Sequence, residues 1–469
     1  MTAMKEELLA LLAPFGQQHV LASWDTLDAG QQAALAAEIR ALDCRLIQRL
    51  HRQAADAGGA GDIRDVADRA ASPPAFRLDS PSNRFAPQEA RQRGSEALRA
   101  GQVGVILVAG GQGTRLGFDH PKGMFSIGPV SGKSLFQIHV EKVLAAARRY
   151  VVRIPLCLMT SPATHAETVE FFARHERFGL PEEDLHIFCQ GTMPAVDAAT
   201  GEILLSEPGH IALSPDGHGG TLAALARSGA LEDLGKRGIR QVFYFQVDNP
   251  LVAVCGAEFI GYHLLSGSEM SSQVVAKREP LEKVGNVVQV DGRLRVIEYI
   301  DLPEEVARRR AADGSLLVWA GSIAVHVFDV AFLERMADRA DALPFHVARK
   351  KVPYVDSSGR KVTPEAPNAI KFERFIFDLM PAAANAIVVE VDPAKGFAPL
   401  KNAPGEKQDT PEWVQDRMAA LHAQWLRQAG AQVAEGVAVE VSPLFALDAE
   451  ELAGKIKPGT RVNSPTYLG

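Results

Sequence analysis

From residue 102 onward, short apolar runs of strand length alternate with longer segments in which apolar residues recur every three or four positions. A run that is apolar throughout is typical of a strand buried on both faces, and the three–four spacing is typical of an amphipathic helix. The alternation therefore predicts βαβ units, with a mostly parallel α/β sheet covered by helices on both faces. The runs include VGVILVAG, IPLCLMT, HIFCQ, QVFYFQVDN and SSQVVAKR, and the segments between them include SLFQIHVEKVLAAARRY, HAETVEFFARHERF and GTLAALARSGALEDLGKRG.

The ends of the chain follow other patterns. Residues 1–98 have mostly helical spacing, interrupted by a Gly- and Ala-rich segment, AADAGGAGDIRD, that predicts a loop, and by a proline-rich connector, SPPAFRLDSPSNRFAP. Within the central part, NVVQVDGRLRVIEYI carries Asp291-Gly292 at its centre and predicts a β-hairpin. After about residue 391, a helical segment, TPEWVQDRMAALHAQWLRQAG, precedes short β-like runs. We therefore predict an N-terminal helical region, 1–98, a central α/β domain, 99–390, and a small C-terminal β-containing domain, 391–469.

Composition and charge limit the classes of partner that the protein is expected to bind. The chain has 469 residues, a length that suits two or three domains, and a net charge of −7 from 50 basic and 57 acidic residues. This balance gives no overall attraction for nucleic acid or for an anionic membrane, so any anion has to be held by a local cluster of basic residues. The start of the chain lacks the layout of a signal peptide and no window reaches 18 uninterrupted apolar residues, so we expect a cytoplasmic protein without a membrane span. The spacing of the four cysteines predicts neither a disulfide framework nor a metal site: Cys44, Cys157, Cys189 and Cys255.

A glycine-rich turn follows the first central strand in VILVAGGQGTRLG, residues 105–117. Glycines directly after a strand let the backbone turn tightly and approach a ligand closely. The spacing is one residue too long for the dinucleotide fingerprint G-x-G-x-x-G, and the P-loop pattern is absent. A turn without a ligand is the plain alternative. Arg115 within the turn and Lys122 in the following PKG place two cations around it, which favours a polyphosphate ligand.

With these residues, the sequence resembles a known family. AGGQGTRLG followed by PKG resembles the signature of sugar nucleotidyltransferases, and the chain is similar to the eukaryotic-type UDP-N-acetylhexosamine pyrophosphorylases and their UDP-sugar pyrophosphorylase relatives. The resemblance implies a Rossmann-like (GT-A-like) fold with a mixed sheet. It covers nearly the whole chain in order, through GTMPAVD, LSPDGHGG, FQVDNPLV, VIEYIDLP, DGSLLVWAGSIAVHVF, KKVPYVD, PNAIKFERFIFD, FAPLKNA and VEVSPLFAL.

The resemblance also implies a reaction: UTP and a hexose 1-phosphate, with Mg²⁺ as cofactor, give a UDP-sugar and pyrophosphate. The attacking phosphate oxygen is already ionised, so the protein has to supply positive charge and alignment rather than a general base. By resemblance, Arg115 and Lys122 contact the UTP phosphates and Lys371 grips the phosphate of the sugar, which makes these three the expected catalytic residues. The expected nucleotide-binding residues are Ala109, Gly110, Gly111, Gly113, Gln190, Pro215 and Gly217.

A second group of residues is implied for the sugar, its phosphate and the metal. Asp248 ends the strand QVFYFQVD, and a carboxylate at that end of an α/β strand faces the crevice where ligands bind. By resemblance, Asp248 is the expected ligand of Mg²⁺, a cation that prefers oxygen ligands. Glu298 is expected to accept hydrogen bonds from sugar hydroxyls, and Lys401 to bind the sugar phosphate. The plain alternatives are a helix N-cap or turn aspartate for Asp248, a cross-strand salt bridge for Glu298 and a solvated lysine for Lys401. The sugar-side set is His218, Asp248, Glu298, Ser322 and Lys401.

Two departures from the family pattern bear on the choice of sugar. His218 stands where acetylhexosamine members have the asparagine of GNGG, and Ser322 stands where they have the asparagine of AGNI. A shorter or different polar side chain changes the hydrogen bonds offered to the hexose. The sugar is therefore expected to be N-acetylglucosamine or glucose, with a broad-specificity UDP-sugar pyrophosphorylase as the alternative.

Other readings stay open. A catalytically silent nucleotide-sugar binding protein would keep the fold but lose the charged residues, and a dinucleotide-dependent oxidoreductase would need the shorter glycine spacing. A guanylyl- or thymidylyltransferase shares the glycine–Arg–Lys signature. Histidines on apolar stretches, His139 and His326, and the aromatic residues Phe375 and Phe377 are expected to be core residues. The sequence does not determine the oligomeric state.

Overall fold

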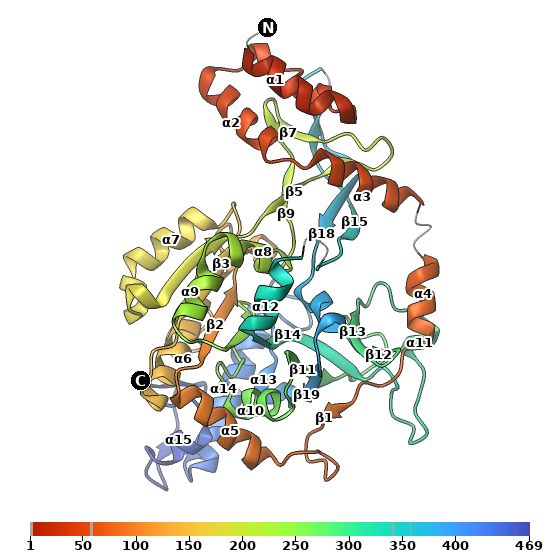
Figure 1. Ribbon diagram of the computed structural model, residues 1–469. Helices are drawn as coiled ribbons and strands as arrows, with labels where there is room; N and C mark the ends of the chain where they lie inside the picture. The colour runs from red at the N-terminus through yellow and green to blue at the C-terminus, as the bar shows by residue number, and fades with distance from the viewer. Residues whose placement is uncertain (1–2, 57–59, 340–341, 357) are drawn as a thin grey trace. The chain divides into compact units, whose positions relative to one another are not determined.

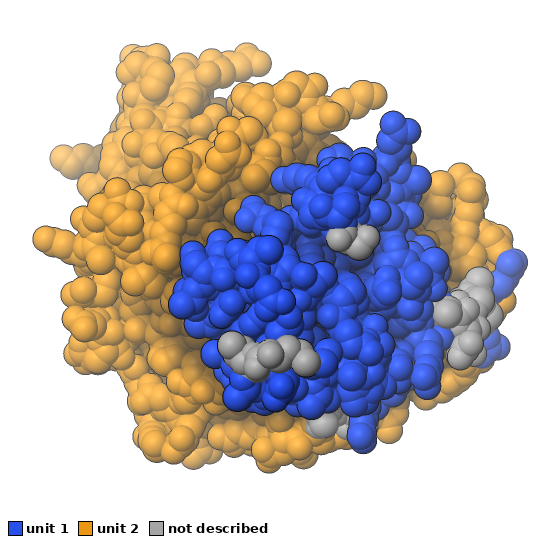
Figure 2. All heavy atoms as spheres, turned by 90° about the horizontal axis from the view of Figure 1, so that it is seen from above, with its two compact units in different colours: residues 1–65, 190–220, 343–378 blue, residues 66–189, 221–342, 379–469 orange. Residues whose placement is uncertain are grey.

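The computed structural model describes residues 3–56, 60–339, 342–356 and 358–469. The chain forms two compact units, each assembled from separate stretches of sequence (Figure 2). Unit 1 comprises Met1–Asp65, Gln190–Gly220 and Leu343–Asp378, and unit 2 comprises Val66–Cys189, Thr221–Ala342 and Leu379–Gly469. The three-part division predicted from the sequence follows chain order and stays a prediction.

Unit 2 is built on a mixed sheet with the strand order β1-β19-β11-β14-β10-β2-β3-β4, to which the hairpin β12–β13 is attached (Figure 1). Neighbouring strands are parallel except at β14, which is antiparallel to both β10 and β11. The strands on this path are β1 (Ala75–Phe76), β2 (Val103–Val108), β3 (Leu156–Thr160), β4 (Leu185–Cys189), β10 (Gln241–Gln246), β11 (Met270–Ala276), β14 (Ala320–Asp329) and β19 (Ile387–Glu390).

Both faces of this sheet are covered, as the apolar runs predict. Val103, Val105 and Leu107 of β2 belong to one buried cluster with residues of the helices that cover the first face. On the opposite face, Gly104 is close enough to helix α9 that an added Cβ atom would lie 3.1 Å from Leu234 Cδ2. The helices of unit 2 are α5 (Pro87–Arg99), α6 (Leu135–Tyr150), α7 (His165–Arg174), α8 (Gly220–Arg227, whose first residue belongs to unit 1), α9 (Ala230–Lys236), α10 (Ala257–Leu265), α11 (Glu304–Ala307), α12 (Val330–Ala337), α13 (Pro393–Gly396), α14 (Pro411–Gln428) and α15 (Ala449–Ala453).

The predicted hairpin is confirmed as β12 (Asn286–Val290) and β13 (Arg293–Ile297). Asp291 and Gly292 have φ angles of 52° and 77°, the left-handed pair that a two-residue hairpin turn requires. The prediction of a loop for AADAGGAGDIRD is wrong wherever the segment is described, because its start belongs to α3 (Cys44–Asp56) and its end to α4 (Ala60–Asp68). Residues 57–59 lie outside the described structure. The proline-rich connector contributes β1, which pairs with β19.

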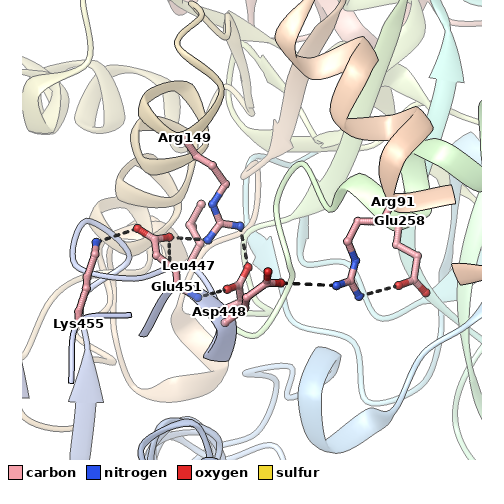
Figure 3. Close-up of polar contacts among 8 residues, drawn as sticks. Arg91, Arg149, Glu258, Leu447, Asp448, Glu451 and Lys455 are labelled. Carbon is pink, nitrogen blue, oxygen red and sulfur yellow. Dashed lines mark hydrogen bonds and ion pairs between the residues drawn. The ribbon is translucent and has the colours of Figure 1, made fainter. Parts of the chain in front are cut away.

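The C-terminal part of unit 2 forms a small module on α14. Its short strands pair as β20 (Gln432–Val433) with β22 (Arg461–Val462) and β21 (Val439–Val441) with β23 (Thr466–Leu468). Acidic residues of this module meet basic residues of the sheet's helices: Arg149 of α6 is paired with Asp448 and Glu451 (Figure 3). The module is thereby attached to α6 by charge-assisted contacts.

Unit 1 combines the N-terminal helices with short strands from two later stretches. The helices α1 (Ala3–Leu12), α2 (Ala29–Arg40) and α3 (Cys44–Asp56) pack through a buried apolar cluster that also contains residues of the strands. The strands are β5 (Thr192–Pro194), β6 (Val196–Asp197), β7 (Leu205–Glu207), β8 (His210–Ile211), β9 (Leu213–Pro215), β15 (His346–Lys350), β16 (Tyr354–Val355), β17 (Lys361–Val362) and β18 (Ala369–Glu373). Among the helices described in either unit, none is long and apolar enough to cross a membrane. All four cysteines are free.

Candidate functional site

The glycine turn after β2 is closed by its own backbone. The Gly113 N–H donates to the His120 carbonyl at 2.9 Å, and the Lys122 N–H donates to the Gly111 carbonyl at 3.0 Å. A Cβ atom on Gly113 would lie 2.7 Å from the Phe118 carbonyl oxygen, so only glycine fits there. The turn leaves Arg115 exposed and Lys122 half-buried.

The turn is also anchored to the neighbouring strand. Ala109 donates its N–H to the Met159 carbonyl at 2.8 Å, and the Gly110 carbonyl accepts a hydrogen bond from Ser161 Oγ at 2.7 Å. These contacts fix the first predicted nucleotide-binding residues at the carboxyl end of β2, the edge of an α/β sheet at which ligands bind.

Three predicted residues meet at that edge. Lys122 Nζ donates to the Leu400 carbonyl at 3.3 Å, and the Leu400 N–H donates to the Asp248 carbonyl at 2.8 Å. Lys401 follows Leu400 directly, so the structure brings Lys122, Asp248 and Lys401 together although they are far apart in sequence. β10 and β2 are parallel neighbours, which places Asp248 beside the glycine turn.

Asp409 is a residue of this group that the sequence does not reveal. Its carbonyl accepts hydrogen bonds from the Lys401 and Asn402 N–H groups at 2.9 and 3.0 Å, and its φ of 61° is left-handed. Burial raises the pKa of the Asp409 carboxyl, Lys401 and Arg278 oppose that rise, and the nearby Asp248 adds to it. In the sequence, Asp409-Thr410-Pro411 indicates only the start of a helix.

Glu298 and Ser322 lie around Gly285. The Ser322 N–H donates to the Gly285 carbonyl at 2.7 Å, and a Cβ atom on Gly285 would lie 3.2 Å from Glu298 Oε1. β14 carries extra residues relative to β11 just after Ser322, with Ala324 at a φ of 54°. This irregularity ends the regular pairing beside Ser322 and changes the direction of the strand there.

The remaining predicted residues belong to unit 1. The Asp216 N–H donates to the Gly191 carbonyl at 3.1 Å, and Pro215 is paired with Thr192, so Gln190 and Pro215 are neighbours. A Cβ atom on Gly217, whose φ is 82°, would lie 2.4 Å from the Arg374 carbonyl oxygen. The SPDGHGG loop therefore packs closely against the end of β18, the strand that carries Lys371.

His218 is held by the same strand end. Its Nδ1 accepts the Ile376 N–H at 3.2 Å, and its ring stacks on Phe375 with the centroids 5.2 Å apart. Burial lowers the pKa of His218 to about 4, so the ring is neutral near pH 7. Phe377 also packs against this ring and is buried, in agreement with its expected core position. Burial likewise lowers the pKa of Lys371.

The predicted residues thus fall into two groups, each gathered within one unit. His139 and His326 are buried, as predicted. Among the residues that the structure describes, no group of three or more His, Cys, Asp or Glu side chains could hold a metal ion by itself. The group in unit 1 is Gln190, Pro215, Gly217, His218 and Lys371, and the group in unit 2 is Ala109, Gly110, Gly111, Gly113, Arg115, Lys122, Asp248, Glu298, Ser322 and Lys401.

Comparison with known proteins identifies the family of the chain. The model of a family described as UTP–glucose-1-phosphate uridylyltransferase matches residues 69–409. The chain belongs to this family. The UDP-N-acetylglucosamine pyrophosphorylase of Saccharomyces cerevisiae is 41% identical over 367 residues, which is 77% of each chain. The human UDP-N-acetylhexosamine pyrophosphorylase-like protein 1 is 38% identical over 442 residues, 92% of this chain and 87% of that one.

A solved structure extends the likeness to the fold. The uridine diphosphate N-acetylglucosamine pyrophosphorylase of Trypanosoma brucei, crystallised with an inhibitor, superposes with a TM-score of 0.81 at 26% identity and covers 99% of both chains. The family model stops at residue 409, whereas this structural match includes the helices of unit 1 and the C-terminal module.

Proposed function

We propose that the protein transfers the uridylyl group of UTP to a hexose 1-phosphate, releasing pyrophosphate and a UDP-sugar. The observation that carries the proposal is the meeting of the glycine turn, Lys122, Asp248 and Lys401 at the carboxyl ends of β2 and β10. Two cations and the Asp248 carboxylate beside a glycine-rich backbone turn suit a nucleoside triphosphate with its metal. Membership of the uridylyltransferase family supports the same reaction.

In this reaction a phosphate oxygen of the sugar forms a bond to the α-phosphorus of UTP while the bond from that phosphorus to the bridging oxygen breaks. The leaving pyrophosphate takes the electron pair, and no proton has to move. Arg115 and Lys122 stabilise the charge that develops on the phosphoryl oxygens and the leaving group, and Lys401 aligns the attacking phosphate. The neutral ring of His218 contributes hydrogen bonding rather than charge.

We propose Mg²⁺ as the cofactor, held by Asp248. Mg²⁺ commonly takes one or two protein carboxylates and completes its shell with water and phosphate oxygens, which fits a site with a single strand-end carboxylate. When bound, the metal neutralises phosphate charge. The contribution of the protein is to hold the Asp248 carboxylate at the edge of the sheet, beside the glycine turn.

The proposed sugar is N-acetylglucosamine, with glucose as the alternative. The relatives named UDP-N-acetylglucosamine pyrophosphorylase or diphosphorylase support the first. His218 and Ser322 favour the second, because both replace asparagines of the acetylhexosamine pattern. A cytoplasmic location stays a prediction.

The test is pyrophosphate release by the purified protein with Mg²⁺, UTP and one sugar phosphate at a time. N-acetylglucosamine 1-phosphate, glucose 1-phosphate and galactose 1-phosphate are compared, with CTP, GTP and dTTP in place of UTP as controls. We expect release with UTP alone among the nucleotides, abolished by EDTA and restored by excess Mg²⁺. Absence of release with every pair, from folded protein, would overturn the proposed function.

A further inference from the structure

We propose that Lys142, on the face of α6 toward the 247–252 loop, is a positioning residue for Asp248, and that the cavity beside it lets a small alkylammonium ion replace it. The inference rests on the proposed function, because it assigns Lys142 to the residue that we propose holds the metal. Lys142 touches no reacting atom.

The contacts of α6 bracket Asp248 on both sides in sequence. Lys142 Nζ donates to the Val252 carbonyl at 2.8 Å and to the Pro250 carbonyl. His139, one turn earlier on α6, contacts the Val247 carbonyl through Nε2 at 2.9 Å. A backbone carbonyl offers no donor, so His139 carries its proton on Nε2. Two side chains of one helix thus bind three carbonyls within six residues.

The other side of the loop is held by the segment that leads to Lys401. Asn249 Nδ2 donates to the Gly396 carbonyl at 2.9 Å, and Asn249 Oδ1 accepts the Ala398 N–H at 3.0 Å. The Leu400 N–H donates to the Asp248 carbonyl at 2.8 Å. The loop is therefore fixed between α6 and residues 396–400, and removal of one side leaves it free to shift.

A lysine at this position carries an energetic cost that packing alone does not explain. Lys142 is partly buried, and among the described residues no carboxylate lies within ion-pair distance of its amine. Burial lowers the pKa of Lys142 to about 7, the sign of an ammonium group without an anionic partner. Methionine or leucine would fill the same volume without that cost. Only the amine can donate the two hydrogen bonds to the carbonyl groups, because an apolar side chain has no donor.

The remaining surface of Lys142 lines a cavity of about 990 Å³ between the sheet's helices and the C-terminal module. Exposed residues of its wall, Gln428 and Glu450, show that it opens to solvent. Figure 3 shows Arg149 and Arg91 among the ion-paired residues of this wall. If the lysine side chain is shortened, a small amine can therefore enter the cavity from solvent and occupy the volume that the side chain leaves.

The experiment compares Lys142→Ala, Lys142→Met and Lys142→Arg in the full-length protein. We expect Lys142→Ala to lose about 10- to 100-fold in kcat, and to bind Mn²⁺ together with UTP correspondingly more weakly by electron paramagnetic resonance of the ion, since a supporting group of a metal ligand is lost. Propylammonium should restore at least about a tenth of the lost activity with saturation, whereas tetramethylammonium at equal ionic strength should not. Lys142→Arg should retain most of both properties.

Lys142→Met separates positioning from packing, because it keeps the volume but cannot donate. We expect the same loss as in Lys142→Ala with no rescue by propylammonium, since the methionine occupies the place of the amine. It also replaces Lys142→Ala if that variant does not fold. The exposed Arg148 on the same helix is the matched control, and Arg148→Ala should match the wild type with and without amine.

Wild-type kcat and Mn²⁺–UTP binding in both Lys142→Ala and Lys142→Met would overturn the inference, as would a loss in Lys142→Ala that propylammonium leaves unchanged in folded protein. Failure of the proposed function is distinct, since the wild type itself would then release no pyrophosphate in the same assay.

Discussion

At the scale of single residues, Arg115 offers the most direct test of the chemistry. It is exposed on a short 3₁₀ turn (Thr114–Leu116), so its loss should leave the fold intact. We expect Arg115→Ala to lower kcat about 10²- to 10³-fold, the usual effect of removing one group that stabilises transition-state charge, without lowering the melting temperature. Pyrophosphate release and thermal unfolding measure the two effects. A variant with near-normal turnover would contradict the role assigned to Arg115.

The site residues predicted from the sequence share one property: their residue type and local spacing by themselves suggest a chemical role. Glycines after a buried strand with Arg115 and Lys122 nearby, and an aspartate at a strand end, point to phosphate and metal before any contact is known. Asp409 and Lys142 give no such signal, because one stands at a helix start and the other on a regular amphipathic helix. Their place in the site depends on hydrogen bonds that local sequence does not show. Asp409 accepts from Lys401, and Lys142 donates to Val252, which is 110 positions away.

At the scale of elements, α5 and α10 pack through glycines that bring their backbones together (Figure 1). A Cβ atom on Gly261 of α10 would lie 1.6 Å from the Ala90 carbonyl oxygen, and one on Gly94 of α5 would lie 1.8 Å from the Ala257 carbonyl oxygen. Gly261→Ala should therefore force the helices apart and lower the free energy of unfolding by about 3 kcal/mol.

The matched control is Gly235→Ala in α9, where an added Cβ atom would meet nothing closer than Glu334 Oε1 at 3.4 Å. There the better helix propensity of alanine should raise the free energy of unfolding by up to about 1 kcal/mol. Urea unfolding of both variants measures the difference. Equal stability of Gly261→Ala and the wild type would show that the two helices are not in backbone contact.

Elements with strong periodicity were predicted correctly, and so was a mixed, mostly parallel sheet, but the position of its antiparallel strand was not predicted. The hairpin β12–β13 and the helices α6 and α14 follow from local patterns and turn residues. The antiparallel direction of β14 cannot be read from local patterns, because an apolar run looks the same in either direction. The pairing of β14 is decided by strands that are distant in sequence. α4 was missed because its glycine-rich surroundings favour a loop.

At the scale of the whole molecule, the discontinuous units could not be predicted from the order of segments. Unit 1 is assembled from Met1–Asp65, Gln190–Gly220 and Leu343–Asp378, and no composition shift marks the points at which the chain passes between the units. What the sequence does carry at this scale is the family, whose motifs run in order along nearly the whole chain.

Buried histidines give the molecule a pH dependence of stability. Burial lowers the pKa of His139 to about 3 and that of His422 to about 4 in unit 2, and that of His218 to about 4 in unit 1. An unfolded chain returns each to its ordinary value of about 6.5. Between pH 6.5 and 4 the unfolded state therefore binds more protons than the folded state, so the stability that these neutral rings contribute is present above pH 6.5 and is lost as the pH falls.

His422 allows this to be measured in unit 2, because its Nδ1 accepts the Val441 N–H at 3.3 Å and an asparagine can offer an acceptor in its place. Each fully linked histidine adds a slope of about 1.4 kcal/mol per pH unit to the free energy of unfolding below pH 6.5. We expect urea unfolding at a series of pH values from 7.5 to about 4.5, followed by tryptophan fluorescence in a Trp24→Phe background, to show His422→Asn with a slope lower by about that amount. Trp319, Trp413 and Trp425 then report on unit 2 alone. An unchanged slope would mean that the ring of His422 is protonated in the folded protein or is reached by water, and that the carboxylates of unit 2 set its acid sensitivity instead.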